Sequence, residues 1–342
     1  MHTDVLPFAS SHVAEAAELL AARHRTVRAQ PPVLPVAYEE PAAARVAIER
    51  LLQNPDCAGF VAMTHGQVAG YLIGRRQLSP ETTIMAIKFD QRATVVPFAG
   101  FAATAGSEAT VLRALYADAA AAWVDEGFFA HYVTTSLLPA TVEPWFSLGF
   151  GQRVLHGIRP IGGPDGGDAG NARAGIPARR AGPDDCDAVH ALIGDLMRHH
   201  APSPIFMPFL PEAVKSERHA IAAWLSDPAV AYFLAEIDGE AVGVIGMHPA
   251  EEFVDELRRP DRSAYLYIGH MRSGARGQGL GTSLVEDGLA WARESGYRAC
   301  VVGWYTAGAL ASRFWPNRGF APATTRLERR VDERVAWAKA RD

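Results

Sequence analysis

The stretch Arg276-Gly277-Gln278-Gly279-Leu280-Gly281 decides the fold of this chain. It follows an apolar run, residues 265–271, and opens a segment with helical character, residues 282–293. The first backbone N–H groups of a helix have no partner within the helix and, with the helix dipole, favour an anion. Gly279 and Gly281 let a phosphate approach the backbone without a Cβ in the way. The stretch therefore predicts a pyrophosphate-binding turn between a strand and a helix.

Two familiar phosphate motifs do not fit this stretch. Its order is Arg-x-x-Gly-x-Gly rather than the dinucleotide fingerprint, and no Gly-Lys-Ser/Thr follows as in a Walker loop. It resembles the acyl-CoA pyrophosphate loop of the GCN5-related N-acetyltransferase (GNAT) family. The same order of elements continues with a helix over 284–294, a strand over 299–305, a helix over 309–315 and the pair Gly319-Phe320. The resemblance covers about residues 176–330.

The chain repeats itself on either side of a glycine-rich stretch. Residues 160–175 carry six glycines, and we predict a linker over 161–175. Residues 60–74 and 233–247 are matching hairpin patterns with glycine at the turn. We therefore predict an α/β protein of two GNAT-like domains, over 1–160 and 176–342. Each is expected to be a mixed, mostly antiparallel splayed sheet flanked by helices.

The two copies are not equal. Carrying the match of Trp123 with Trp291 back along the helix places Glu108 opposite Arg276 and Val111 opposite Gly279. A carboxylate and a Cβ at these places both oppose a pyrophosphate. We therefore expect a degenerate N-terminal copy that serves as a structural unit or as a wall of the substrate site.

The resemblance implies transfer of an acyl group, with acetyl expected, from acetyl-CoA to a primary amine of a small molecule. In the C-terminal domain, the backbone of Gly269, His270 and Met271 would hold the pantetheine arm. The residues implied to bind the pyrophosphate are Arg276, Gly277, Gln278, Gly279, Leu280, Gly281 and Thr282.

Direct transfer needs a general base, because amines such as lysine are mostly protonated near pH 7. His270 lies next to the expected splay and can titrate near neutral pH. Tyr267, or Glu252 acting through a water, is an equally good alternative, and His248 and Glu251 stay open.

The departing thiolate needs a proton. The tyrosine that the family often places four residues before the Gly of Gly-Phe corresponds to Trp315, whose indole is not a useful acid. The frequent asparagine at the start of that helix corresponds to Gly308. Either the thiolate leaves unassisted, or another group such as Tyr305 or Ser312 serves as the acid. Tyr305 is the first candidate, because it ends the strand that faces the splay.

Composition limits the remaining classes. The 342 residues carry a net charge of −5 and no basic block, which argues against nucleic-acid and membrane-surface binding. We find no apolar run long enough for a membrane span and no signal peptide, so we expect a cytoplasmic protein. Three separated cysteines and the pair His199-His200 give no metal-ligand pattern, so we expect no metal. The alanine-rich composition, with arginine far exceeding lysine, is typical of a GC-rich bacterial genome.

Two other functions stay open. One is a CoA-binding sensor or scaffold that lost its acid, supported by Trp315 and Gly308. The other is an aminoacyl-tRNA-dependent transferase, which predicts a basic surface that the composition does not favour. We expect a monomer or a homodimer. A monomer is reasonable because two fused copies can mimic the dimer of single-domain proteins.

Overall fold

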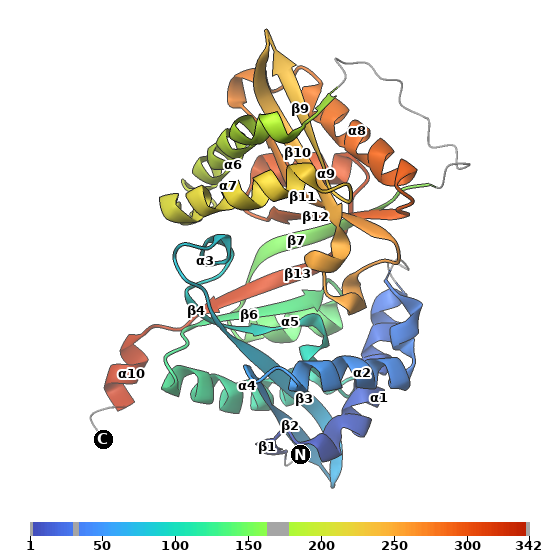
Figure 1. Ribbon diagram of the computed structural model, residues 1–342. Helices are drawn as coiled ribbons and strands as arrows, with labels where there is room; N and C mark the ends of the chain where they lie inside the picture. Colours follow the sequence, from blue (N-terminus) through green and yellow to red (C-terminus); the bar gives the residue numbers. More distant parts are fainter. Residues whose placement is uncertain (1–2, 30–33, 163–177, 340–342) are drawn as a thin grey trace.

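The computed structural model describes residues 3–29, 34–162 and 178–339 (Figure 1). The predicted linker, residues 161–175, lies outside the described residues from residue 163 onward. The N-terminal half contains, in chain order, β1 (Asp4–Pro7), α1 (Val13–Arg28), α2 (Pro41–Leu52), β2 (Cys57–Thr64), β3 (Gln67–Leu78), α3 (Ile84–Lys88), β4 (Arg92–Val96), η3 (Phe98–Gly100), β5 (Phe101–Ala103), α4 (Glu108–Asp125), β6 (Ala130–Ser136), α5 (Pro139–Ser147) and β7 (Gly151–Pro160).

The C-terminal half follows the same plan. Its elements are β8 (Arg179–Arg180), α6 (Cys186–His200), α7 (Pro211–Ser226), β9 (Ala231–Ile237), β10 (Glu240–Pro249), η5 (Ala250–Glu252), η6 (Glu256–Arg258), β11 (Ser263–Met271), η7 (Ser273–Ala275), α8 (Leu280–Glu294), β12 (Ala299–Tyr305), α9 (Ala309–Asn317), β13 (Ala321–Arg330) and α10 (Arg334–Lys339). Each predicted strand and helix of the loop region lies where the sequence placed it, and both predicted hairpins turn at Gly66 and Gly239, which have φ of 78° and 80°.

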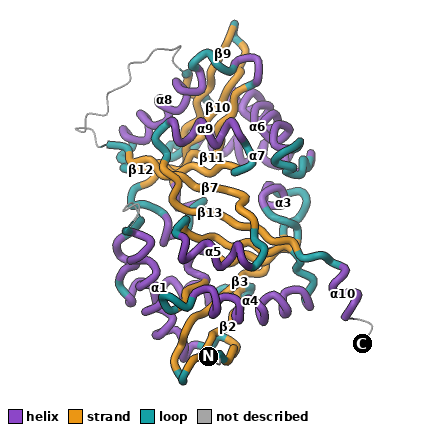
Figure 2. The backbone as a smooth tube through the Cα atoms, turned by 180° about the vertical axis from the view of Figure 1, so that it is seen from behind, coloured by secondary structure: helices purple, strands orange, loops and turns teal. Residues whose placement is uncertain are grey.

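The two halves share one continuous sheet. Its strand order is β1-β2-β3-β4-β6-β13-β7-β12-β11-β10-β9-β8, with β5 paired to β3 beside this path. Only β4 with β6 and β11 with β12 pair in parallel, as far as the described strands go. The mixed, mostly antiparallel sheet that the sequence predicts is confirmed, and Figure 2 shows its strands running through the middle of the molecule.

The halves exchange strands at the centre of this sheet. β7, the last strand of the N-terminal half, pairs antiparallel with β12 of the C-terminal half. β13, from the C-terminal half, pairs antiparallel with β6 of the N-terminal half. β7 and β13 also pair with each other, and Figure 1 shows both between the two groups of helices. A boundary at residue 160 therefore divides the chain into two segments, and each segment contributes a strand that pairs with a strand of the other.

Helices cover both faces of each half. In the C-terminal half, α8 and α9 bury residues such as Leu284 and Trp315 on one face, while α6 and α7 bury residues such as Leu192 and Ile221 on the other. In the N-terminal half, α4 and α5 lie on one face and α1 and α2 on the other. No helix among the described residues is long and apolar enough to cross a membrane.

The structure does not support the expected alignment of the two halves around the loop, in which Glu108 corresponds to Arg276 and Val111 to Gly279. A Cβ placed on Gly70 would lie 2.5 Å from Val111, and one placed on Gly243 would lie 3.1 Å from Leu284. Val111 therefore corresponds to Leu284, not to Gly279. Glu108 begins α4 and is not the counterpart of Arg276.

The difference arises from loop length. The strand-to-helix loop covers residues 104–107 in the N-terminal half and 272–279 in the C-terminal half, four residues more. The helices differ as well, since α4 has 18 residues and α8 has 15. Aligning Trp123 with Trp291 therefore places the residues at the starts of the two helices out of register. The N-terminal half lacks the long loop rather than carrying it with substituted residues.

Candidate functional site

The loop before α8 presents a row of backbone donors. Gly277 and Gly279 adopt φ of 82° and 83°, a left-handed conformation that favours glycine. The helix closes on the Gly279 carbonyl, which accepts from the N–H of Thr282 at 2.9 Å and of Ser283 at 3.1 Å. Among the described residues, no backbone carbonyl accepts a hydrogen bond from the N–H groups of residues 277–281. These donors are free for an anion at the positive end of the helix dipole.

The arginines around this loop differ in their availability. Arg276 donates from Nε to the Met271 carbonyl at 3.0 Å, so its side chain folds along the end of β11. Arg272 is held by two carboxylates, Asp195 at 3.0 Å and Glu240 at 2.5 Å. Arg276 therefore supplies the positive charge that no carboxylate neutralises at this loop, as far as the described residues show.

The sheet opens beside the same loop. β12 pairs with β11 only from Ser263 to Leu266, so the edge of β11 from Tyr267 to Met271 faces no partner strand there. On its other edge, β11 pairs with β10, and the register passes from Ile268 to Leu266 and leaves Tyr267 as a bulge. The backbone of Gly269 and its neighbours is thus available at a gap between two parallel strands, where the sequence predicts the pantetheine arm.

A cavity of about 860 Å³ reaches from this gap to the N-terminal half. Its lining includes Tyr267, Gly269 and Tyr305 from the two parted strands and Trp315 from α9. Lys88, at the end of α3, lines the same cavity from the N-terminal half. Both halves therefore build the walls of one chamber.

Tyr267 is buried and hydrogen-bonded. Its hydroxyl donates to Oε1 of Glu217 at 2.5 Å, and Glu217 on α7 is itself buried. Burial, followed by the nearby Glu217 charge, raises the pKa of Tyr267 well above its ordinary value. Tyr267 is thus a neutral hydroxyl near pH 7, oriented by a carboxylate that the sequence analysis did not single out.

His270 lies on the buried face of β11 toward α6. Its ring centre lies 6.4 Å from that of His199, and its Nε2 is buried without a hydrogen-bond partner. Burial, followed by the Arg276 charge, lowers the pKa of His270 to about 4. His270 is therefore a neutral imidazole near pH 7, and it is not among the side chains that line the cavity.

Tyr305 is half-buried at the end of β12. Its ring packs edge-on against His200 with centres 5.2 Å apart, and burial lowers the pKa of His200 to about 4. The cavity therefore brings together Tyr267 and Tyr305, two of the three predicted catalytic side chains. The three roles stay predictions.

Trp315 covers the predicted pantetheine strand. A Cβ placed on Gly269 would lie 3.1 Å from the Trp315 indole, so only glycine lets β11 and α9 approach this closely. Trp315 is buried, 7% exposed, and packs against Phe320 of the Gly-Phe pair. The tryptophan therefore forms an apolar wall at the gap.

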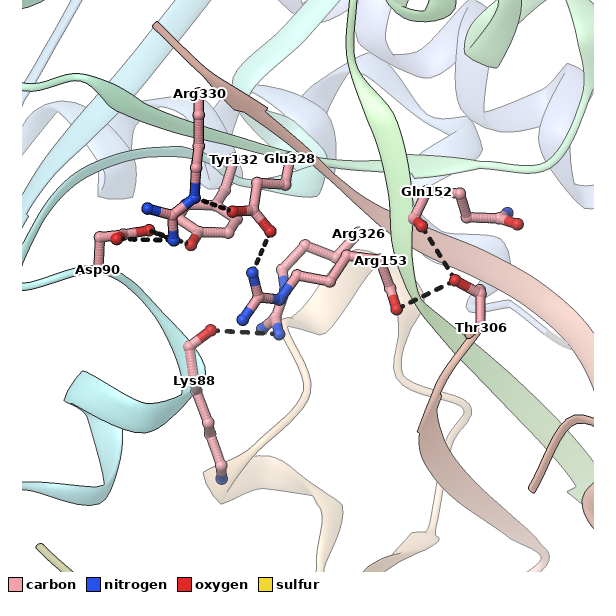
Figure 3. Close-up of polar contacts among 9 residues, drawn as sticks. All are labelled: Lys88, Asp90, Tyr132, Gln152, Arg153, Thr306, Arg326, Glu328 and Arg330. Carbon is pink, nitrogen blue, oxygen red and sulfur yellow. Dashed lines mark hydrogen bonds and ion pairs between the residues drawn. The ribbon is translucent and has the colours of Figure 1, made fainter. Parts of the chain in front are cut away.

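A charged cluster joins the two halves where β7 and β13 meet (Figure 3). Glu328 pairs with Arg153 and with Arg330, and Asp90 accepts from Arg330 at 2.8 Å and from the Tyr132 hydroxyl at 2.7 Å. These contacts give both carboxylates a cationic partner and give Arg153 and Arg330 a carboxylate.

Arg326 and Lys88 stand outside that pairing. Arg326 donates to the Lys88 carbonyl at 3.4 Å and lies 4.4 Å from the Phe89 ring centre. The Lys88 ammonium lies 4.7 Å from the Tyr267 ring centre, and Figure 3 shows it directed away from the cluster. Burial lowers the pKa of Lys88 to about 8, opposed by Glu217 and assisted by Arg326. Lys88 is one of three lysines in a chain rich in arginine, but rarity alone does not indicate where in the fold a residue lies.

The described residues contain no group of three or more His, Cys, Asp or Glu side chains arranged to hold a metal ion. His199 and His200 are the last two residues of α6.

Comparisons with known proteins bear on the site and on the whole chain. Residues 196–320 match the sequence model of the acetyltransferase (GNAT) family. No curated protein matches the chain at a significant level. A GCN5-related N-acetyltransferase from Sphaerobacter thermophilus has a similar structure, with a TM-score of 0.58, 12% identity, and coverage of 96% of this chain and 95% of that chain. A GCN5-related glucosamine N-acetyltransferase region of a fungal multi-domain GH3 β-N-acetylglucosaminidase gives a TM-score of 0.53 and 13% identity, covering 96% of this chain and 38% of that chain.

Proposed function

We propose that this chain transfers an acetyl group from acetyl-CoA to a primary amine of a small molecule. The match of residues 196–320 to the acetyltransferase (GNAT) family model supports this proposal. The C-terminal half binds acetyl-CoA and carries the reaction. We place the reaction in a reducing compartment, the bacterial cytoplasm, in keeping with the free thiols of Cys57, Cys186 and Cys300.

The observation that carries this proposal is the row of free N–H groups over residues 277–281. They lie at the start of α8, next to Arg276 and to the gap where β11 and β12 part. A pyrophosphate on these donors would direct the rest of the CoA molecule along the open edge of β11. The thioester would then lie at the cavity, whose walls include Tyr267 and Tyr305.

In the proposed reaction, the amine nitrogen attacks the thioester carbonyl carbon, the C–S bond breaks, and an amide and CoA form. The amine loses one proton and the CoA thiolate gains one. We assign the second proton to Tyr305, whose hydroxyl lines the cavity. For the first, the proposal keeps His270 and Tyr267 as alternatives, and Tyr267 has Glu217 at 2.5 Å to receive its own proton.

We further propose that the N-terminal half, residues 1–160, binds no CoA. Its loop, residues 104–107, is four residues shorter than its counterpart and leads into Glu108 at the first turn of α4, where a carboxylate repels an anion. Its contribution is the cavity wall that includes Lys88. Because each half completes the other's sheet within one chain, the proposal needs no second copy for the site.

Calorimetric titration of acetyl-CoA into the full chain, followed by a thiol-release assay with a panel of amines, tests the proposal. We expect one acetyl-CoA per chain with an affinity of about 1–100 μM, and thiol release that depends on the amine. A stoichiometry of two would contradict the assignment of a single CoA site. No binding at all would remove the function.

The alternative is a CoA-binding sensor or scaffold without catalysis. Trp315 favours it, because its indole covers Gly269 at the place where the family often carries a tyrosine. This alternative predicts the same single CoA site, without thiol release for any amine in the panel.

A further inference from the structure

We propose that Lys88 and Arg326 form a cationic wall that binds a carboxylate of the acceptor, so that the acceptor is an amine of amino-acid type. The wall belongs to the cavity of about 860 Å³, and both side chains line it. The inference rests on the proposed function for the reaction, but the carboxylate site is tested below by binding alone.

The first support is that, among the described residues, neither cation forms an ion pair with a carboxylate; the Glu217 charge acts on the pKa of Lys88, but no hydrogen bond or ion pair joins the two side chains. No ion pair or hydrogen bond joins either side chain to a carboxylate, as far as the described part of the chain extends; Arg326 reaches only the Lys88 carbonyl. A buried or half-buried charge is costly unless it is paired and hydrogen-bonded. The same half-buried setting explains why burial lowers the pKa of both groups. A bound anion would supply the missing partner.

The second support is the contrast with neighbouring arginines. Arg153 and Arg330 share Glu328 and Asp90 immediately beside Arg326. Arg258, on another wall of the cavity, pairs with Asp255. The fold thus gives these three arginines a directly paired carboxylate. Lys88 and Arg326 face the chamber without such a direct pair among the described residues.

The third support is that the lysine is held in place. α3 packs against α7, where the Ser216 hydroxyl donates to the Thr82 carbonyl at 2.7 Å. Ile87, next to Lys88, is buried with Met207 and Val214 of the C-terminal half. A fixed backbone lowers the entropy that a binding side chain loses when its ligand arrives.

The position of Lys88 connects this wall to the reaction. Its ammonium lies 4.7 Å from the ring centre of Tyr267, the bulged residue at the gap between β11 and β12. An acceptor whose carboxylate binds Lys88 would therefore have its amine close to the proposed thioester. Glu251 and Glu252 line the same cavity and suit the amino group of such an acceptor.

A carboxylate fits this wall better than a phosphate dianion. Arg326 offers a planar fork that matches the two oxygens of a carboxylate, and Lys88 offers a single compact charge. The rest of the nearby surface is aromatic, from Phe89, Tyr132 and Tyr267. The two cations, with the opposing Glu217 charge that acts on Lys88, leave one net positive charge, which matches one carboxylate and not a dianion.

Binding can be measured without turnover. The full chain is reductively methylated with ¹³C, which labels its lysines while keeping their charge, and the Lys88 signal is assigned with Lys88→Met. The probes are N-acetylglycine, N-acetyl-β-alanine and N-acetyl-4-aminobutyrate, each compared with its neutral amide. We expect at least one carboxylate to shift the Lys88 signal until it saturates, and to bind about tenfold more tightly than its amide. Arg326→Met should weaken the binding of that carboxylate about tenfold.

Three results would overturn the carboxylate site: no shift of the Lys88 signal by any probe at about 50 mM, equal binding of amide and carboxylate, or stronger binding of methyl phosphate than of every carboxylate. The control variant is Lys215→Met, which removes an exposed lysine of α7 and should leave the Lys88 response unchanged.

Kinetics then separate this inference from the proposed function. Lys88→Met should lower kcat/KM for amino acids about tenfold or more, relative to their amides, and leave the KM for acetyl-CoA unchanged. If the wild-type chain acetylates only amines without a carboxylate, the inference fails and the proposed function stands. If the chain binds no acetyl-CoA, the proposed function fails while the lysine spectra still decide the carboxylate site.

Discussion

At the scale of single residues, two side chains of the cavity wall favour ligand binding at a cost to the stability of the fold. Lys88 and Arg326 keep positive charge in a half-buried position beside aromatic rings. Such charges reduce the stability of the unliganded fold unless a partner compensates them. The natural residue at position 88 should therefore be a poor choice for stability and a good one for binding.

Lys88→Met tests that trade-off. The pKa of Lys88 in the fold, about 8, is below its ordinary value of 10.5, so the cost of burying the charge is complete below pH 8 and disappears as pH rises through 10.5. We expect the variant to be more stable than wild type at pH 7, by about 1 kcal/mol, and the gain to vanish near pH 10.5. Urea denaturation at both pH values measures the difference. Equal stability changes at the two values would show that the charge is not the cause.

Gly281→Glu tests the loop. A Cβ at Gly281 would have only the Phe314 ring nearby, at 3.8 Å, so the fold should tolerate a side chain there. A carboxylate among the free N–H groups would repel the pyrophosphate, and we expect the Kd of acetyl-CoA to rise about 100-fold or more. Ser295→Glu places the same charge at the far end of α8 and should leave the Kd unchanged. Undiminished affinity in Gly281→Glu would remove the loop assignment.

Tyr305→Phe tests the proposed acid. Loss of the hydroxyl should lower kcat by about 100-fold or more, since proton transfer by a positioned side chain contributes on that scale. The Kd of acetyl-CoA should stay constant, because the ring is retained. Tyr297→Phe, which removes a hydroxyl at the far end of α8, provides the matched control. An unchanged kcat would show that the thiolate leaves without a proton from Tyr305.

At the scale of elements, loop length separates the two halves. The first half has four residues between β5 and α4 where the second has eight between β11 and α8. The longer loop has room for η7 and for two glycines in the left-handed conformation before the helix begins. Its free donors result from this extra length together with Gly277 and Gly279.

Point substitutions should therefore not create a second CoA site in the first half. Glu108→Arg with Val111→Gly should leave one acetyl-CoA per chain by calorimetry. Because Val111 is buried against Gly70, its loss should instead cost about 2–4 kcal/mol of stability. A stoichiometry of two would mean that the short loop is sufficient.

The sequence was most informative where a pattern is local. The loop, the hairpins at Gly66 and Gly239, and the helices after each strand follow from glycine placement and apolar periodicity. The alignment of the two copies failed around Glu108 because single tryptophans cannot reveal a change in loop and helix length.

Lys88 and Glu217 could not be found from the sequence. Each lies in a helix without a catalytic motif, and they meet Tyr267 only through the packing of α3 on α7. Contacts between segments far apart in the chain leave no local signal.

At the scale of the whole molecule, the exchange of β7 and β13 should make unfolding one event. Each strand completes the sheet of the other half, so neither half keeps its pairing when the other unfolds. We expect a single calorimetric transition for the full chain. Two separate transitions would contradict this coupling.

Gly157→Val, in β7, tests the same coupling. A Cβ there would lie 2.7 Å from Trp304, and we expect a loss of about 1–3 kcal/mol. The whole transition should move to lower temperature. Gly151→Val, in the same strand, has open space around it and should have little effect. A shift confined to part of the transition would show that the halves unfold independently.

The exchanged strands also set an order for biosynthesis. β6 leaves the ribosome long before β13, its partner in the finished sheet, has been translated. Until then, the nascent N-terminal half carries an open strand edge, and β7 waits for β12 in the same way. Open edges invite pairing with other chains. The protein should therefore depend on chaperones most strongly while its second half is still being synthesised.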